Sequence, residues 1–138
     1  MHFYRNKIWV FDDIIDKSHQ DEIESTLLNN NFSWYFIREI STPPVGPVPR
    51  PAFQHQFVRK GGEVNSDWNE MAMRIVNSSC KKIGLQYDKV HQGRSFFQLP
   101  LNNVDKDILD PVHIDDENIP HMVVLYYVKD SDGDTIIY

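Results

Sequence analysis

What the sequence has little of already limits what the protein can be. Cys80 is its only cysteine, so no internal disulfide can form, which fits a reducing compartment. The longest uncharged apolar run after the N-terminal region, Met122–Val128, is far shorter than the roughly 20 residues of a membrane-spanning helix. Basic residues form no cluster, and 14 Lys and Arg stand against 20 Asp and Glu, which disfavours nucleic-acid binding. We therefore predict a cytoplasmic protein that binds neither membranes nor nucleic acids.

The overall composition is that of a folded domain. Hydrophobic residues make up 41% of the sequence and charged residues 25%, which are ordinary values for a globular chain. A length of 138 residues is enough for one sizeable core. We therefore predict a single domain over residues 1–138.

Two segments have the residue spacing of amphipathic helices. Ser18 is a candidate N-cap, with Asp21 three residues later, and the helix should end near Asn29. Ser66 is the candidate N-cap of a second helix, which Gly84 should end. The second helix has one apolar stripe, made of Trp68, Met71, Ala72, Ile75, Val76, Cys80 and Ile83.

Several other segments have the composition of β-strands. They are rich in β-branched and aromatic residues, and Gly, Pro, Asn or Asp separate many of them. Helices in the first part of the chain, followed by successive strands, predict an α+β fold. The expected strands cover residues 8–15, 32–40, 53–59, 90–101, 109–115, 121–129 and 135–138, with an Asp-Gly turn at 132–133 before the last of them.

His113-Ile114-Asp115 is the pattern with the clearest chemical content. Residues i and i+2 of a strand point to the same side, so this imidazole and this carboxylate can approach one metal ion together. One His and one carboxylate are two of the three ligands in the facial triad that holds non-haem Fe(II). The pattern is short, however, and it also arises by chance without binding a metal.

The residues around this pattern carry a resemblance to a known family. Pro111–Asp116 is followed, after a short polar link, by the apolar run His121–Val128, an acidic segment at 129–134 and a last apolar segment at 135–138. Over about residues 94–138 the chain resembles the iron- and 2-oxoglutarate-dependent oxygenases, especially their prolyl-hydroxylase-like branch. In that branch a His-x-Asp pair precedes a Tyr-Tyr strand and an acidic turn.

The resemblance implies a double-stranded β-helix, which is a jelly-roll core with supporting helices on one side. Residues 1–86 would form the support, and residues 87–138 about the first half of the core. The family's distal metal-binding His and the Arg that holds 2-oxoglutarate belong to the second half. On this template, residues 87–138 contain neither the distal His nor that Arg. We therefore expect an incomplete core and an oxygenase with little or no turnover.

The implied activity is hydroxylation with Fe(II) as cofactor and 2-oxoglutarate as co-substrate. The substrate would be a small molecule or a peptide, with peptidyl proline suggested by analogy alone. His113 and Asp115 would be the proximal metal ligands. His121 follows Asp115 too closely to be the family's distal ligand.

The resemblance also suggests residues that would bind the co-substrate. Tyr127 matches a tyrosine that hydrogen-bonds the co-substrate carboxylate, although Tyr126 and Tyr127 are equally well explained as residues that pack in a sheet. Gln98 shares strand parity with Arg94 and would face the cavity.

A second function, from a different class, also fits these observations. The protein would then be a non-catalytic jelly-roll module that binds a small molecule or another chain. An incomplete jelly roll leaves strand edges and apolar side chains uncovered, and such surfaces recruit partners. We therefore expect a homodimer with two-fold symmetry that forms through the C-terminal strands, around Met122–Tyr138.

Overall fold

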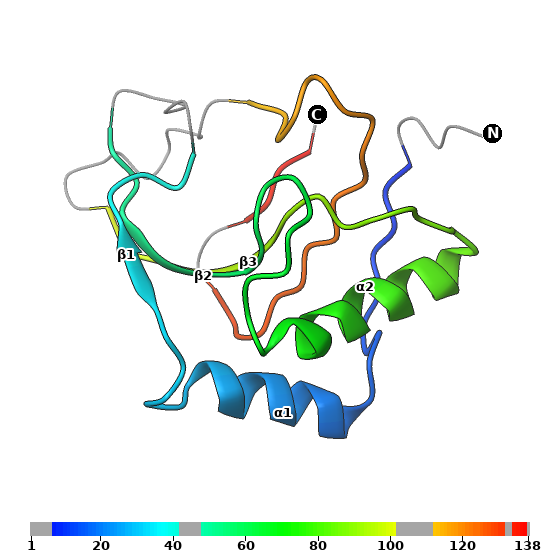
Figure 1. The fold of residues 1–138 in the computed structure, drawn as a ribbon, viewed down its shortest axis with the longest axis horizontal. Coiled ribbons are helices and arrows are strands. Elements are labelled where there is room, and N and C mark those ends of the chain that lie inside the picture. The colour runs from blue at the N-terminus through cyan, green and yellow to red at the C-terminus, as the bar shows by residue number, and fades with distance from the viewer. Residues whose placement is uncertain (1–6, 42–47, 102–111, 132–133, 138) are drawn as a thin grey trace.

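The computed structural model describes residues 7–41, 48–101, 112–131 and 134–137. Three strands form one antiparallel sheet in the order β1-β2-β3, and two helices lie at one side of it (Figure 1). This is a small α+β structure, as the sequence predicts. No helix in these ranges is long and apolar enough to cross a membrane. The elements are α1 (Lys17–Leu27), β1 (Tyr35–Ile37), β2 (Ala52–Val58), α2 (Asn69–Ile83) and β3 (Gly93–Gln98).

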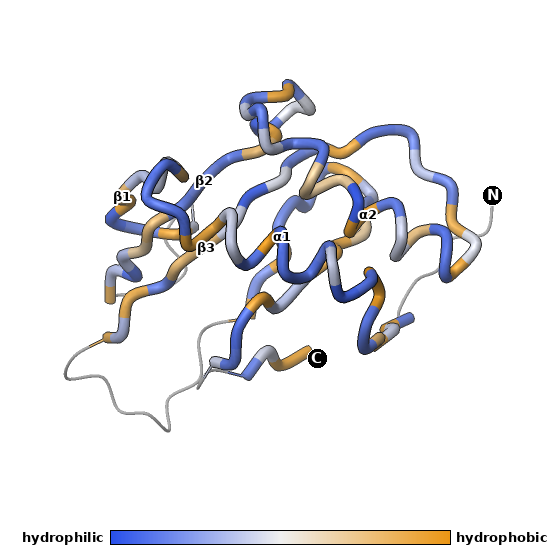
Figure 2. Tube along the Cα trace, turned by 90° about the horizontal axis from the view of Figure 1, so that it is seen from below, coloured by the Kyte–Doolittle hydropathy of each residue, from blue (hydrophilic) through white to orange (hydrophobic). Residues whose placement is uncertain are grey.

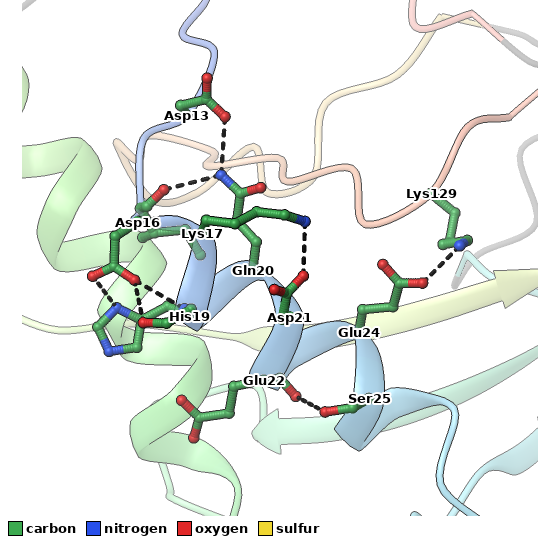
Figure 3. Close-up of polar contacts among 12 residues, drawn as sticks. Asp13, Asp16, Lys17, His19, Gln20, Asp21, Glu22, Glu24, Ser25 and Lys129 are labelled. Carbon is green, nitrogen blue, oxygen red and sulfur yellow. Dashed lines mark hydrogen bonds and ion pairs between the residues drawn. The ribbon is translucent and has the colours of Figure 1, made fainter.

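Asp16, and not Ser18, caps helix α1, so the predicted N-cap is wrong by two residues. The Asp16 carboxylate accepts hydrogen bonds from the Ser18 hydroxyl at 2.6 Å and from the His19 backbone N–H at 3.0 Å (Figure 3). These two bonds, the Ser18 hydroxyl first, lower the pKa of Asp16. A carboxylate suits this position because the start of a helix has free N–H groups and a partial positive charge.

Helix α1 also contacts the C-terminal part of the chain. The Lys129 ammonium lies 2.7 Å from a Glu24 carboxylate oxygen (Figure 3). Both side chains remain in contact with solvent, so this ion pair contributes little to stability. It does place residue 129 directly against α1.

Helix α2 ends as predicted but begins later than predicted. Gly84 adopts the left-handed conformation, with φ of 68°, and its N–H bonds to the carbonyls of Cys80 and Lys81. At the other end, Trp68 is the N-cap and has no side-chain capping bond. The Ser66 hydroxyl instead accepts from the Trp68 N–H at 3.1 Å, before the helix starts.

The core forms where one side of β2 faces the two helices. Phe57 of β2 is buried together with Ile23 of α1 and Met71 of α2. Tyr126 and Val128, from the C-terminal segment, are half-buried and pack against this cluster. The buried members are Ile15, Ile23, Phe32, Phe57, Val58 and Met71.

His55 on β2 is buried and links this strand to the segments before β1 and before α2. Its Nδ1 lies 2.8 Å from the Ser33 carbonyl oxygen and its Nε2 lies 2.7 Å from the Ser66 hydroxyl. A carbonyl only accepts, so Nδ1 donates to Ser33, while Nε2 forms the second bond with the Ser66 hydroxyl. The ring also lies against Phe32, with centroids 4.4 Å apart. His55 therefore has a structural role that the sequence pattern does not indicate.

Four predicted strands are wrong within the described residues. Strands at 32–40, 53–59 and 90–101 are present with shorter bounds, as β1, β2 and β3. The described parts of 8–15, 109–115, 121–129 and 135–138 form no strand, while residues 109–111 and 138 and the predicted turn at 132–133 lie outside the description. Hydrophobic residues nevertheless recur along the coloured part of the trace (Figure 2).

The segment at 122–128 has the alternating burial of a strand without being one. Its side chains alternate between two environments, as those of a strand do. No described segment pairs with its backbone, however, and a strand needs such a partner for its hydrogen bonds. Val124, Tyr126 and Val128 are half-buried, whereas Val123, Leu125 and Tyr127 are exposed.

We predict that truncating Phe57 destabilises the protein far more than truncating Phe97. Phe57 is 5% exposed, whereas Phe97 is 59% exposed. Phe57→Ala should lower the free energy of unfolding by about 3–5 kcal/mol, or unfold the chain, because it leaves a cavity in the core. Phe97→Ala should change it by about 0.5 kcal/mol or less. Urea denaturation followed by circular dichroism measures both, and equal effects would contradict this location of the core.

Candidate functional site

His113 and Asp115 lie close together on the surface. The distance from His113 Nε2 to Asp115 Oδ1 is 3.9 Å, and each side chain is 53% exposed. Two ligand atoms at about 2.1 Å from one ion lie about 3.0 Å apart at right angles and about 4.2 Å apart when opposite. The observed distance lies between these limits, so the two atoms would have to approach each other to take adjacent positions on one ion, as the facial triad requires. An imidazole nitrogen and a carboxylate oxygen are also donors that suit Fe(II).

A third protein ligand is not brought to this pair by the residues that the structure describes. Within them, no three His, Cys, Asp or Glu side chains gather closely enough to hold a metal. His121 belongs to no such group, and its Nδ1 lies 2.7 Å from the Ile119 carbonyl oxygen. An ion held by His113 and Asp115 alone would keep most of its coordination positions for water.

Asp116 fixes the turn that follows the candidate ligands. Its carboxylate accepts from the Asn118 backbone N–H at 2.9 Å and lies 3.5 Å from the Lys60 ammonium. The Asn118 hydrogen bond, and after it the Lys60 charge, lower the pKa of Asp116. The sequence indicates a turn residue here, but nothing in it indicates Lys60, which follows β2.

The side of the sheet opposite the core carries a row of polar side chains and one aromatic ring. Arg94 pairs across the sheet with Gln56, and Phe96 pairs with Gln54. Gln98 continues the same side of β3, so the predicted parity of Arg94 and Gln98 is present. We call this surface the polar face, made of Gln54, Gln56, Arg94, Phe96 and Gln98.

Arg94 on the polar face is held by two contacts. Its guanidinium carbon lies 4.3 Å from the centroid of the Phe96 ring, and its Nη1 donates to the Ile40 carbonyl at 3.3 Å. Desolvation of the guanidinium lowers the pKa of Arg94, while the negative charge of Asp115 acts in the opposite direction. Asp115 therefore lies within electrostatic range of Arg94.

The two adjacent tyrosines point to different surroundings. Tyr126 packs against the core, and burial raises its pKa. Tyr127 is 56% exposed, and its hydroxyl hydrogen-bonds with the Thr135 hydroxyl. In the described part of the chain, no hydrogen bond or ion pair joins Tyr127 or Gln98 to Asp115. The geometry thus brings His113 and Asp115 together, and leaves Tyr127 and Gln98 without a hydrogen bond or ion pair to Asp115 among the described residues.

A pocket at the end of α2 is separate from the candidate site residues. Burial raises the pKa of the Cys80 thiol on its wall, which leaves this thiol a poor nucleophile. None of the candidate residues lines it. The lining residues are Asn77, Cys80, Lys81, Leu85, Gln86 and Tyr87.

Comparisons of the chain with protein-family models, with curated proteins and with solved structures found no match.

We predict that the Asp116 carboxyl titrates below its ordinary pKa of 3.8, because of the Asn118 hydrogen bond first and the contact with Lys60 after it. Asp116 thus stabilises the fold at neutral pH, and this contribution is lost as the pH falls through its lowered pKa. Lys60→Gln should raise the Asp116 pKa, while the Asn118 hydrogen bond keeps it below 3.8. Carbon-detected NMR titration measures this, with Lys82→Gln as control. An Asp116 pKa unchanged by Lys60→Gln would contradict the contact.

Proposed function

We propose that the chain carries the metal-binding part of an Fe(II)- and 2-oxoglutarate-dependent oxygenase with a jelly-roll core. The observation that supports this most directly is the 3.9 Å distance between His113 Nε2 and Asp115 Oδ1, both accessible to solvent. The helices at one side of the sheet agree with the supporting helices of such a core. The proposal adds to these observations the resemblance of the sequence around His113 to that family.

In this proposal each described group has a separate task. His113 and Asp115 hold the ion and leave positions open for the co-substrate and for oxygen. Fe(II), when bound, supplies the oxidative chemistry that no side chain can supply. Tyr127 and Gln98 remain proposed co-substrate ligands, and the exposed Tyr127 is accessible for that task. The substrate proposed is a small molecule or a peptide.

We predict that Fe(II) binding depends on His113 and Asp115. Removing an outer partner of a metal ligand commonly costs about 10–100-fold in affinity, and removing a ligand itself should cost more. Anaerobic calorimetric titration with Fe(II) should therefore show binding that His113→Ala and Asp115→Asn abolish. His91→Ala and Asp88→Asn are the matched controls, because they change the same residue types elsewhere.

Succinate formation in the presence of 2-oxoglutarate is measured on the same samples. We expect little turnover, because the described residues supply only two protein ligands. Fe(II) binding that survives both His113→Ala and Asp115→Asn would contradict the proposed site. Robust turnover that His113→Ala abolishes would reveal a third ligand outside the described residues.

A non-catalytic binding module is the second candidate, and a different observation favours it. Phe36, Phe53 and Phe97 lie side by side across the three strands, and the outer two are 60% and 59% exposed. Exposed aromatic side chains in a row are a common feature of binding surfaces. If the titration described above detects no Fe(II) binding, the binding module is favoured over the enzyme.

Association into a homodimer through residues 122–137 is a further part of the proposal. Val123, Leu125 and Ile136 are 58%, 59% and 51% exposed. The backbone of 122–128 has no strand partner within the described residues, and unpaired backbone of this kind recruits other strands. A two-fold dimer would supply the missing partner and cover these side chains.

We predict that Leu125→Lys weakens this dimer, because a charge placed in an apolar contact must be desolvated. Sedimentation at micromolar concentration should show a dimer for the wild-type protein and a monomer for Leu125→Lys. Leu28→Lys is the control, since Leu28 is similarly exposed, at 64%, but lies at the end of α1. A monomeric wild-type protein would contradict the dimer.

A further inference from the structure

We infer that Arg94 and Gln56 form a carboxylate-binding subsite on the polar face. This inference rests on the proposed function, because it names the chemical class of ligand that an oxygenase of this kind would take.

The Arg94 guanidinium is held in place before any ligand binds. The Phe96 ring lies 4.3 Å beneath it, and one N–H group donates to the Ile40 carbonyl. A guanidinium has five N–H donors in a planar fork, so most of them remain for a ligand. A carboxylate accepts two parallel hydrogen bonds from such a fork. Little side-chain entropy is left to lose on binding, because the stacking already restricts the rotamers.

Gln56 supplies the second group of donors. It lies directly opposite Arg94 in the β2–β3 pairing, and opposite residues have Cβ atoms about 4.5–5.5 Å apart. Its backbone carbonyl accepts from Asn65, but its side-chain amide has no hydrogen bond with the described residues. A carboxylate between the Arg94 fork and this amide would receive donors from two adjacent strands.

The Asp115 carboxylate does not occupy the Arg94 guanidinium. No ion pair of 4 Å or less joins Asp115 to Arg94 in the described residues, so the donors of Arg94 are not taken up by Asp115.

Two sources can supply this carboxylate. The first is 2-oxoglutarate itself, and the second is an acidic side chain of a peptide substrate. Both present the same planar anion to Arg94. They differ in that 2-oxoglutarate has a second carboxylate and a keto group, whereas a blocked glutamate has one carboxylate only.

NMR titration of the metal-free protein, kept in EDTA, tests the subsite. The probes are 2-oxoglutarate and N-acetyl-glutamate amide, added separately. Either probe should shift the Arg94 Nε–H and the Gln56 side-chain amide signals. Arg94→Gln should weaken binding about 10-fold or more, because it removes a charged hydrogen-bond donor pair. Arg94→Lys should rescue it only in part, since an ammonium lacks the fork. Arg59→Gln, which changes an exposed arginine at the end of β2, should leave it unchanged.

The outcomes separate the two ligand sources. Binding of 2-oxoglutarate alone assigns the subsite to the co-substrate, and binding of both probes with similar affinity assigns it to carboxylates in general, acidic substrates included. The inference is overturned if neither probe shifts these two signals, or if Arg94→Gln binds as well as the wild type. Should Arg94→Gln fail to fold, the map of shifted signals in the wild type and the weakened binding of Gln56→Leu decide the question.

Failure of this inference is distinguishable from failure of the proposed function. Metal binding is measured without the probes, and probe binding without metal. Fe(II) binding that depends on His113, in a protein that binds neither probe, overturns the subsite alone. Probe binding that depends on Arg94, in a protein that binds no Fe(II), overturns the proposed oxygenase site alone.

Discussion

The burial of one side of β2 against the two helices is the constraint on which the rest of the described structure depends. Phe57 and His55 face the helices, with Phe57 inside the apolar cluster and His55 bonded to Ser33 and Ser66. Because successive residues of a strand face opposite sides, this burial also directs Gln54 and Gln56 away from the core. The polar face is thus a direct consequence of how the core packs.

The polar face and the candidate metal ligands come from separate parts of the chain. Arg94 belongs to β3, whereas Asp115 belongs to the C-terminal segment. That segment is attached by Tyr126 and Val128, which pack against the core, and by the ion pairs that Lys60 and Lys129 make. Largely exposed ion pairs contribute little energy. The packing of two half-buried side chains is therefore the main contact that holds the segment to the core.

The thinness of the core explains why so much of the proposed chemistry lies at the surface. No large side chain among the described residues is completely buried. His113 and Asp115 are both half-exposed, so water competes with any ion that they hold. Arg94 is exposed as a residue, yet its guanidinium is partly desolvated by the Phe96 ring. Desolvation of this kind strengthens the attraction between a guanidinium and an anion.

Features that depend on residues close together in the chain could be predicted from the sequence. The apolar stripe predicts α2, Gly84 predicts its end, and strand parity places Arg94 and Gln98 on one side of the sheet. Helical hydrogen bonds join residues four apart, so the signals for a helix lie within it. Features that need partners distant in the chain follow from the tertiary structure and not from local spacing. The alternation at 122–128 indicates which side chains face the core, but a strand also requires a neighbouring backbone, and none of the described segments supplies one. The Lys60–Asp116 contact and the hydrogen bond from Arg94 to the Ile40 carbonyl depend on the same kind of long-range approach, which no spacing in the sequence encodes.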